Sequence, residues 1–285
     1  MRLNPFTDKC LCGSGRILLE CCLKDCRPAR NRARTGWSNR RCYAAPLGDC
    51  ASTISREHYI TEGVLKLIGD PITIKGFPWQ GEEMTLPTKD LTSKILCQRH
   101  NPALSELDKV GIRFFEKLRA AIVENPLSHT VASSHIYLFR GEMVELWMLK
   151  VLCGLIVSKN ALDRTGTLIN AALPRNWLGV LFEHEPMPGG WGLYMPGSVS
   201  HAFGSTHPNG ALVIYENATL FGFILTLDYL SFILAMNNPP RERAGTLLEN
   251  CTYRPDEIEI NSRHRQDTLR LFWERPGDER RITNS

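Results

Sequence analysis

Cysteine and histidine residues gather into two groups in the first hundred residues of this chain, and both groups have the spacing of metal ligands. The chain has ten cysteines, and seven of them lie in the first fifty residues. The opening MRLNPFTDKC lacks the apolar stretch of a signal peptide, so we expect a cytoplasmic protein with reduced thiols. Clustered cysteines in that setting indicate metal binding rather than disulfides.

The first group has the spacing C-x-C-x8-C-C. It supplies four thiolates: Cys10, Cys12, Cys21 and Cys22. Four soft ligands this close together can surround one tetrahedral Zn²⁺, and Gly13 and Gly15 let the backbone turn between the two halves. The alternative is a reduced loop without metal, but so small a segment would have little core to hold it folded.

This segment resembles the SEC-C motif, a small zinc module, because both the C-x-C-G-S-G core and the eight-residue gap match. It departs from the motif in the middle, where Ile17, Leu18 and Leu19 replace a Lys-rich run. The resemblance implies an adaptor that contacts a protein partner or nucleic acid, and it does not imply a catalyst.

The second group consists of two pairs of residues that lie far apart in the sequence. Cys42 and Cys50 form the first pair, and Cys97 and His100 form the second. The C-x2-H pair has ordinary zinc spacing, whereas the C-x7-C pair is wider than usual. We expect these four side chains to hold a second structural Zn²⁺.

Between and after the two pairs come the dipeptide Glu57-His58 and the residue Asn101. The order Cys, Cys, Glu-His, Cys-x2-His-Asn and helix resembles the HNH-type endonucleases, a treble-clef family. In that family a zinc-stapled knuckle carries an acid–histidine pair on a β-hairpin, and the last His or Asn begins the following helix. The resemblance covers roughly residues 42–123, with a longer insert, Thr61–Ser93, than compact HNH modules have.

The resemblance implies a metal-dependent endonuclease, with DNA as the favoured substrate. His58 would be the general base, because a neutral imidazole can take a proton from water near pH 7. Glu57 and Asn101 would hold Mg²⁺ or Mn²⁺ through oxygen atoms, and the ion would stabilise charge on the scissile phosphate. Arginine side chains would contact the nucleic-acid backbone: Arg40, Arg41, Arg56 and Arg99.

Three features depart from the HNH pattern. The central Asn of the family has no counterpart, since no Asn lies between Asn39 and Asn101. Asp90 and Thr88 are both candidates for its role. In addition, the final metal ligand is Asn rather than His, and the zinc pair ends in His100 rather than Cys.

Positive charge is concentrated at the N-terminal end of the chain. Residues 1–60 contain eleven Lys and Arg against five Asp and Glu, a net of +6, so with +4 overall the remaining 225 residues carry a net of −2. Residues 27–41, RPARNRARTGWSNRR, read as an Arg-rich linker, and Trp37 and Tyr43 nearby would allow base stacking. The pattern predicts an anionic partner such as nucleic acid, although a solvated linker explains it equally well.

Two other hypotheses remain open alongside the nuclease. In the first, the zinc sites are structural and the chain is a non-catalytic module that binds nucleic acid or a protein. Glu57 is then a surface acid, and His58 a histidine that stabilises the fold or a further candidate zinc ligand. In the second, residues 126–285 carry the function and sense a ligand or partner, and the zinc modules are a scaffold.

The elements that must position these residues belong to an α+β protein. We expect four parts: a zinc module at 1–26, the linker at 27–41, a treble-clef domain at 42–125 and a strand-rich α+β domain at 126–285. Helices are expected at Pro102–Val123 and Glu142–Val157. Strands are expected at His135–Phe139, Gly192–Met195, Ala211–Tyr215, Leu220–Leu227, Glu257–Ile260 and Thr268–Trp273.

One apolar run, Ala218–Met236, is long enough to cross a membrane. Asp228 interrupts it near the middle, and Gly222 and Tyr229 weaken it further. We therefore expect two buried strands, or a strand and a helix, and no membrane partner.

Overall fold

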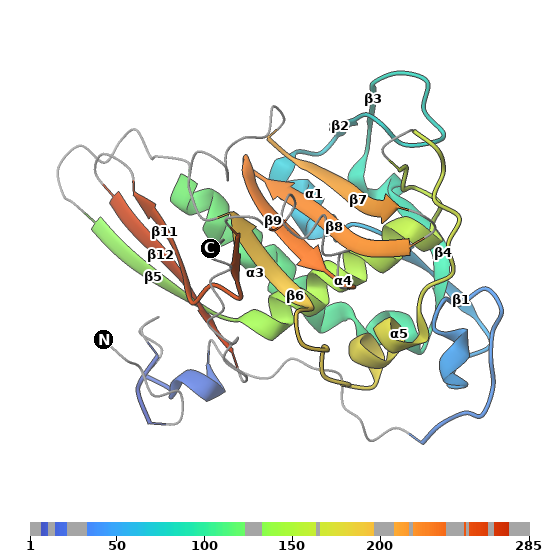
Figure 1. The fold of residues 1–285 in the computed structure, drawn as a ribbon, viewed down its shortest axis with the longest axis horizontal. Helices are drawn as coiled ribbons and strands as arrows, with labels where there is room; N and C mark the ends of the chain where they lie inside the picture. The colour runs from blue at the N-terminus through green and yellow to red at the C-terminus, as the bar shows by residue number, and fades with distance from the viewer. Residues whose placement is uncertain are drawn as a thin grey trace, which may run out of the picture.

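The computed structural model has the mixed α+β architecture expected from the sequence (Figure 1). It describes residues 7–10, 15–21, 33–122, 133–163, 166–196, 208–216, 219–237, 248, 251–261 and 265–273.

The region expected to be a treble clef, residues 42–125, is built on an antiparallel hairpin followed directly by helices. Strand β1 (Ile54–His58) pairs with β4 (Thr92–Cys97), and α2 (His100–Ala103) and α3 (Ser105–Ile122) follow. The helix expected from Pro102 is thereby confirmed. The insert between the two strands contains α1 (Glu62–Ile68), a small hairpin of β2 (Ile72–Ile74) and β3 (Met84–Leu86), and a 3-10 turn at Thr88–Asp90.

Helix α4 (Gly141–Val157) is the central element of the molecule. It packs against α3 on one side and against β8 and β9 of the larger sheet on another. Because partners surround it, nearly every side chain from Met143 to Ile156 is buried, including the charged Glu145 and Lys150. Gly111 of α3 permits the close approach of the two helices, since a Cβ atom there would meet the Trp147 ring at 2.2 Å.

Two sheets complete the fold. The larger has the order β10-β6-β9-β8-β7 and is antiparallel throughout. Its strands are β6 (Gly192–Pro196), β7 (Gly210–Glu216), β8 (Thr219–Leu227), β9 (Leu230–Ala235) and β10 (Cys251–Tyr253). Helix α5 (Arg175–Phe182) packs beside α4. The smaller sheet has the order β11-β12-β5, with bounds Glu257–Asn261, Arg265–Phe272 and Ser133–Arg140, and β12 runs parallel to β5.

The apolar run Ala218–Met236 forms two strands, β8 and β9, as the first alternative predicted. Asp228 and Tyr229, with φ of 44° and 69°, make the tight turn between them. Among the described residues, no helix is long and apolar enough to span a membrane.

One buried cluster joins the two expected domains on either side of residue 125. It includes Leu96 and Phe114 from the first region, and Trp147, Phe232 and Leu269 from the second. The hairpin-and-helix region before residue 125 and the strand-rich region after it therefore share a hydrophobic core.

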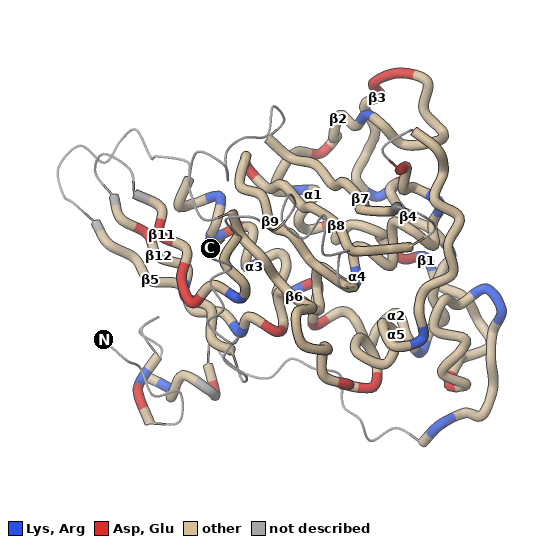
Figure 2. Tube along the Cα trace, viewed as in Figure 1, with Lys and Arg blue, Asp and Glu red and all other residues tan. Residues whose placement is uncertain are grey.

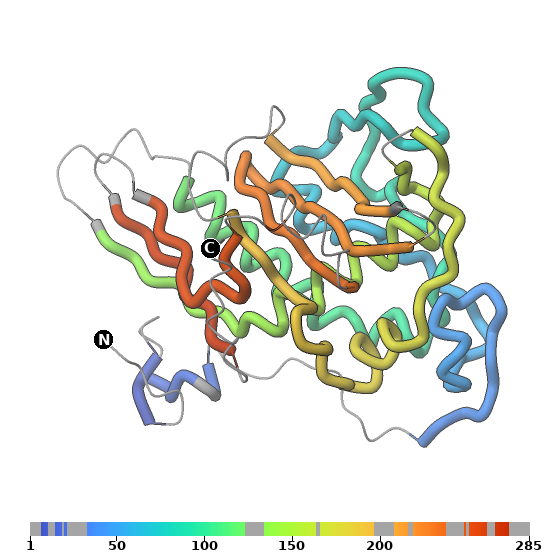
Figure 3. The backbone as a smooth tube through the Cα atoms, viewed as in Figure 1, coloured from blue at the N-terminus to red at the C-terminus, as the bar shows by residue number. Residues whose placement is uncertain are grey.

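The Cys-rich N-terminal segment lies at the other end of the molecule from the β1–β4 hairpin (Figure 3). Cys10 and Leu18 pack against Leu138 of β5 and Phe272 of β12. The two expected zinc modules are consequently attached to different parts of the fold.

Candidate metal centre

Four ligand side chains from distant parts of the sequence meet at the end of the β1–β4 hairpin where Ile54 pairs with Cys97. Cys42 and Cys50 come from the loop before β1, Cys97 ends β4, and His100 begins α2. Their ligand atoms all lie within 4.8 Å of one another, and all four residues are buried. This is the second group expected from the sequence, and the structure brings it together.

Short-range contacts of the loop explain why Cys42 and Cys50 face each other. Gly48, with φ of 65°, ends the 3-10 turn Ala45–Leu47 and reverses the chain between them. The side-chain amide of Asn39 donates to the carbonyl of Ser52 at 2.9 Å, which fastens the loop to the start of the hairpin. The two cysteines are therefore held in place by backbone contacts as well as by anything they bind.

The distances within the cluster fit a tetrahedral metal ion. The His100 Nδ1 atom lies 3.6 Å from Cys42 Sγ, 3.9 Å from Cys50 Sγ and 3.2 Å from Cys97 Sγ. Metal–sulfur and metal–nitrogen bonds of zinc length, at the tetrahedral angle, would separate sulfur and nitrogen by about 3.5 Å. The distances from His100 to the three sulfur atoms are therefore close to those of a tetrahedral site.

The protonation of the cluster also suits metal binding. Burial lowers the pKa of His100, so its imidazole is neutral near pH 7 and has a lone pair to donate. Burial raises the pKa of Cys42 and Cys50, whereas Cys97 has a lowered pKa because backbone N–H groups, that of Ala51 foremost, outweigh its burial. A bound cation would supply the charge that turns the protonated thiols into ligands.

The first cysteine group is described only in part. Cys12 and Cys22 lie outside the described residues, Cys10 is buried, and Cys21 is partly buried. Gly15 has a φ of 73°, and an isolated antiparallel bridge joins Lys9 to Ile17, while Gly13, the other glycine of the expected turn, lies outside the described residues. Metal binding by this group stays a prediction.

Glu57, the expected metal-binding acid, is buried in an ion-pair network. Its Oε1 atom lies 2.6 Å from Lys150 Nζ, at an angle outside the hydrogen-bond range. The same ammonium donates to Asp108, whose Oδ1 also accepts from the Thr61 hydroxyl at 2.6 Å. Thr61 in turn accepts from Trp147 Nε1 at 3.0 Å. Burial raises the pKa of Glu57, and the attraction of Lys150 opposes that rise.

His58, the expected general base, ends β1 and is partly exposed. Its Nε2 atom lies 3.9 Å from the Glu62 carboxylate and makes no hydrogen bond within the described part of the chain. Burial lowers the pKa of His58, so the imidazole is neutral near pH 7. Across the hairpin its partner is Thr92, while the expected candidates for the central Asn lie elsewhere: Thr88 is buried in the 3-10 turn, and Asp90 is exposed at the end of that turn.

Asn101 fastens the start of α2 to β1. Its side-chain amide donates to Ser55 Oγ at 3.0 Å and to the Arg56 carbonyl at 2.8 Å. These bonds explain, without reference to a metal, why an amide is useful at this position.

The four expected phosphate-contacting arginines differ in their surroundings. Arg99 donates to Asp49 at 2.9 Å and to the Ala33 carbonyl at 2.8 Å, so its guanidinium is engaged within the protein. Arg40, Arg41 and Arg56 are exposed.

Lys150 and Asp108 are the residues of this region that sequence reasoning missed. A signal for Lys150 was available, because it is one of very few charges in the apolar sequence EMVELWMLKVLCGLIV. A buried charge in such a helix requires a partner, although the sequence does not say which one.

Comparison of the chain with protein-family models, with curated proteins and with solved structures gave no significant match. The SEC-C and HNH resemblances therefore rest on the motif residues alone, and the arrangement of the side chains must carry any functional conclusion.

Proposed function

We propose that the region from Cys42 to Ile122 is a zinc-stapled module that binds nucleic acid without cutting it. Cys42, Cys50, Cys97 and His100 hold one structural Zn²⁺, because three thiolates and an imidazole at these distances are a common closed zinc set. The ion fixes the loop before β1 to the hairpin and to the start of α2.

The observation that carries the non-catalytic assignment is the ion pair of Glu57 with Lys150. A Mg²⁺ ion keeps several water ligands and needs oxygen atoms that face an open space. Glu57 is instead 7% exposed and its counterion, Lys150, is 3% exposed. The ammonium supplies, from within the chain, the positive charge that a catalytic metal would bring, and it leaves no open coordination position for a phosphate.

Nucleic acid is favoured as the partner by the positive charge that surrounds the zinc ligands. Arg40 and Arg41 directly precede Cys42, and Arg56 lies on β1, all three exposed. Neutralisation of phosphates by such side chains is the main source of affinity in non-specific nucleic-acid binding.

The test is a binding and cleavage experiment on the full, zinc-loaded chain. Fluorescence anisotropy with labelled DNA and RNA should give binding that weakens as salt rises, and gels run after incubation with Mg²⁺ or Mn²⁺ should reveal intact oligonucleotides. Cleavage that disappears in His58→Ala while zinc content and folding are retained would replace this proposal with the nuclease.

The second candidate is the HNH-type endonuclease, and it is favoured by the state of His58. A neutral, partly exposed imidazole at the end of β1 has the protonation state that a general base requires. In this mechanism His58 accepts a proton from water, while Glu57 and Asn101 hold a Mg²⁺ or Mn²⁺ ion that stabilises charge on the phosphate. Glu57 would have to exchange Lys150 for that ion, so cleavage should then be faster in Lys150→Ala.

We propose a second structural Zn²⁺ at Cys10, Cys12, Cys21 and Cys22, in a module that contacts a protein partner. Support comes from the C-x-C-x8-C-C spacing, from the left-handed backbone of Gly15 and from the bridge between Lys9 and Ile17. Metal analysis by mass spectrometry should give two Zn²⁺ per chain and one in a Cys12→Ser/Cys22→Ser variant. One Zn²⁺ in the wild type would remove this second site.

A further inference from the structure

Four exposed basic side chains lie on the β1–β4 hairpin and on the loop that is hydrogen-bonded to it. We define the basic strip as Arg40, Arg41, Arg56 and Lys94, and the exposed indole of Trp37 belongs to the same loop as the first two. We propose that the basic strip binds single-stranded nucleic acid, with Trp37 stacking on a base. This inference rests on the proposed nucleic-acid function and names the form of nucleic acid and the surface.

Arg56 and Lys94 are neighbours through the pairing of the hairpin. Ser55 pairs with Leu96 and Glu57 with Ser93, so the irregularity between these pairs places Lys94 and Ile95 opposite Arg56. Arg56 and Lys94 are exposed, while Glu57 and Ile95 are buried. Since side chains alternate between faces, the two cations share the outer face of the hairpin.

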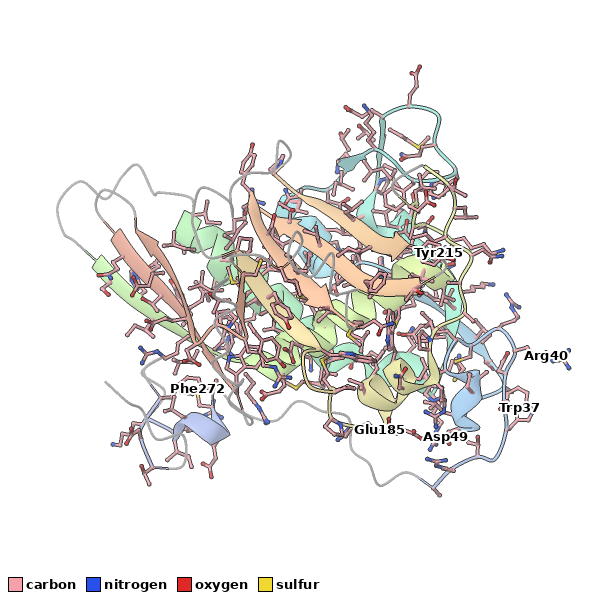
Figure 4. The ribbon with its side chains drawn as sticks, viewed as in Figure 1. Trp37, Arg40, Asp49, Glu185, Tyr215 and Phe272 are labelled. Atoms are coloured by element: carbon pink, nitrogen blue, oxygen red, sulfur yellow. The ribbon has the colours of Figure 1, made fainter. Side chains whose placement is uncertain are left out.

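The loop that carries Arg40 and Arg41 is fastened to the same hairpin. The Tyr43 N–H donates to the Ile95 carbonyl at 2.9 Å, and Cys50 N–H donates to the Trp37 carbonyl at 2.8 Å. Figure 4 shows the side chains of Trp37 and Arg40 pointing outward from this loop, away from the body of the molecule. The loop therefore extends the hairpin surface instead of covering it.

Nearby carboxylates turn away from the basic strip and do not neutralise it. Asp49 is paired with Arg99, and Glu57 with Lys150. Among the described residues, the ion pairs found include none that involves a member of the strip. Figure 2 shows basic positions along this loop and around β1. Four unneutralised cations on one face attract a polyanion.

The exposed indole of Trp37 favours single-stranded nucleic acid over a duplex as the molecule bound. Trp37 is 45% exposed, and its carbonyl, not its side chain, makes the contact to Cys50. Bases in a duplex already stack on each other, whereas the bases of a single strand can stack on an aromatic ring. Basic side chains together with an exposed aromatic side chain are the combination that non-specific single-strand binders use.

The experiment measures the affinity of full-length, zinc-loaded protein for labelled oligothymidylate and for a mixed-sequence duplex by anisotropy. Arg40→Ala/Arg41→Ala and Arg56→Ala should each weaken binding of both probes and reduce the salt slope by about one per arginine removed. Trp37→Ala should weaken single-strand binding roughly five- to a hundredfold and leave duplex binding nearly unchanged, and Trp37→Phe should restore part of the loss.

The matched control is Lys75→Ala/Lys89→Ala, which removes two exposed lysines of the insert and should leave both affinities unchanged. Zinc content and the thermal unfolding midpoint report whether each variant is folded. If the wild type binds neither probe, the proposed function fails. If it binds and the strip variants bind equally well, only the basic strip is overturned. An equal loss of affinity for the two probes in Trp37→Ala would also overturn the single-strand assignment. Tighter binding of polyglutamate than of oligothymidylate would overturn it as well.

Discussion

The two ends of the β1–β4 hairpin make an instructive comparison. At one end Cys97 and His100 meet Cys42 and Cys50, and the nearby guanidinium of Arg99 is paired with Asp49. At the other end the carboxylate of Glu57 is already neutralised by Lys150. Both ends look like ligand sets in the sequence, and they differ in whether the rest of the chain supplies the counterion.

A metal site requires ligand residues at the right spacing, and it also requires that no cation of the chain itself pairs with them. Burial raises the pKa of the Cys42 thiol, so a nearby cation would favour its ionised form, and we expect the Cys42 end to depend on a metal. A buried carboxylate beside a buried ammonium has its charge balanced internally. The decisive residue, Lys150, lies on a helix that is remote in sequence from the motif.

The largest effect should follow from removing one ligand of the cluster of Cys42, Cys50, Cys97 and His100. Cys97→Ser removes a ligand that is 0% exposed, and loss of structural zinc forfeits roughly 10 kcal/mol of apparent binding free energy. We expect the variant to lose one equivalent of zinc and its cooperative unfolding transition. Metal analysis and calorimetry check this, and Cys251→Ser, half-buried and outside the cluster, should keep the metal. A stable Cys97→Ser protein would show that the core, not the ion, holds the loop.

The second effect concerns the internal cation. Lys150→Met leaves the buried Glu57 and the partly buried Asp108 without their shared ammonium, which should cost about 3–5 kcal/mol in the free energy of unfolding. Denaturant titration measures this loss. The triple variant Glu57→Gln/Asp108→Asn/Lys150→Met removes the whole charge set and should recover much of the stability.

Lys150→Ala should turn the second end into a cation site, because it removes the ammonium together with most of the side-chain volume. Two carboxylates and the Thr61 hydroxyl would then face the vacated volume. We expect weak Mn²⁺ binding, detected by the loss of the free-ion electron paramagnetic resonance signal, that the wild type lacks. Mn²⁺ binding by the wild type would favour the nuclease hypothesis instead.

A smaller effect concerns how the free energy of unfolding depends on pH. Burial lowers the folded-state pKa of His58 below its ordinary value near 6.5, so the unfolded chain binds the proton more tightly. The stability contributed by the neutral form is present above pH 6.5 and is lost as pH falls through the interval between the two pKa values. His58→Gln should remove this part of the pH dependence, measured as the difference between the two unfolding curves. Parallel curves down to acidic pH would contradict it.

The smallest effect should come from Asn101, which joins the two ends through β1. Asn101→Ala removes bonds to Ser55 and to the Arg56 carbonyl and should cost about 1–2 kcal/mol. Thermal unfolding measures this cost, and zinc content should stay unchanged. A loss of zinc would mean that Asn101 also positions His100.

The sequence predicted the pair Cys97 and His100 and the helix that follows it, because both are local signals. The C-x2-H spacing at the end of β4 and the helical periodicity of α3 lie within a few residues. Asp228 predicted the break between β8 and β9, because a polar residue in an apolar run favours a turn.

The surroundings of Glu57 could not be predicted, because they depend on tertiary packing. Glu57, Asp108 and Lys150 come from β1, α3 and α4, and their meeting depends on how α4 packs in the shared core. For the same reason Arg99 was expected at a phosphate, while the fold pairs it with Asp49. Long-range charge pairing leaves no periodic trace in a sequence.

The docking of the N-terminal segment has a consequence for the order in which the molecule is completed during synthesis. Leu18 leaves the ribosome early, but its neighbours Leu138 and Phe272 belong to β5 and β12, and β12 is the last strand described. At ordinary elongation speeds, roughly ten to fifty seconds pass between the synthesis of Leu18 and that of Phe272. The segment around Leu18 must therefore wait for β12 before it can take its place.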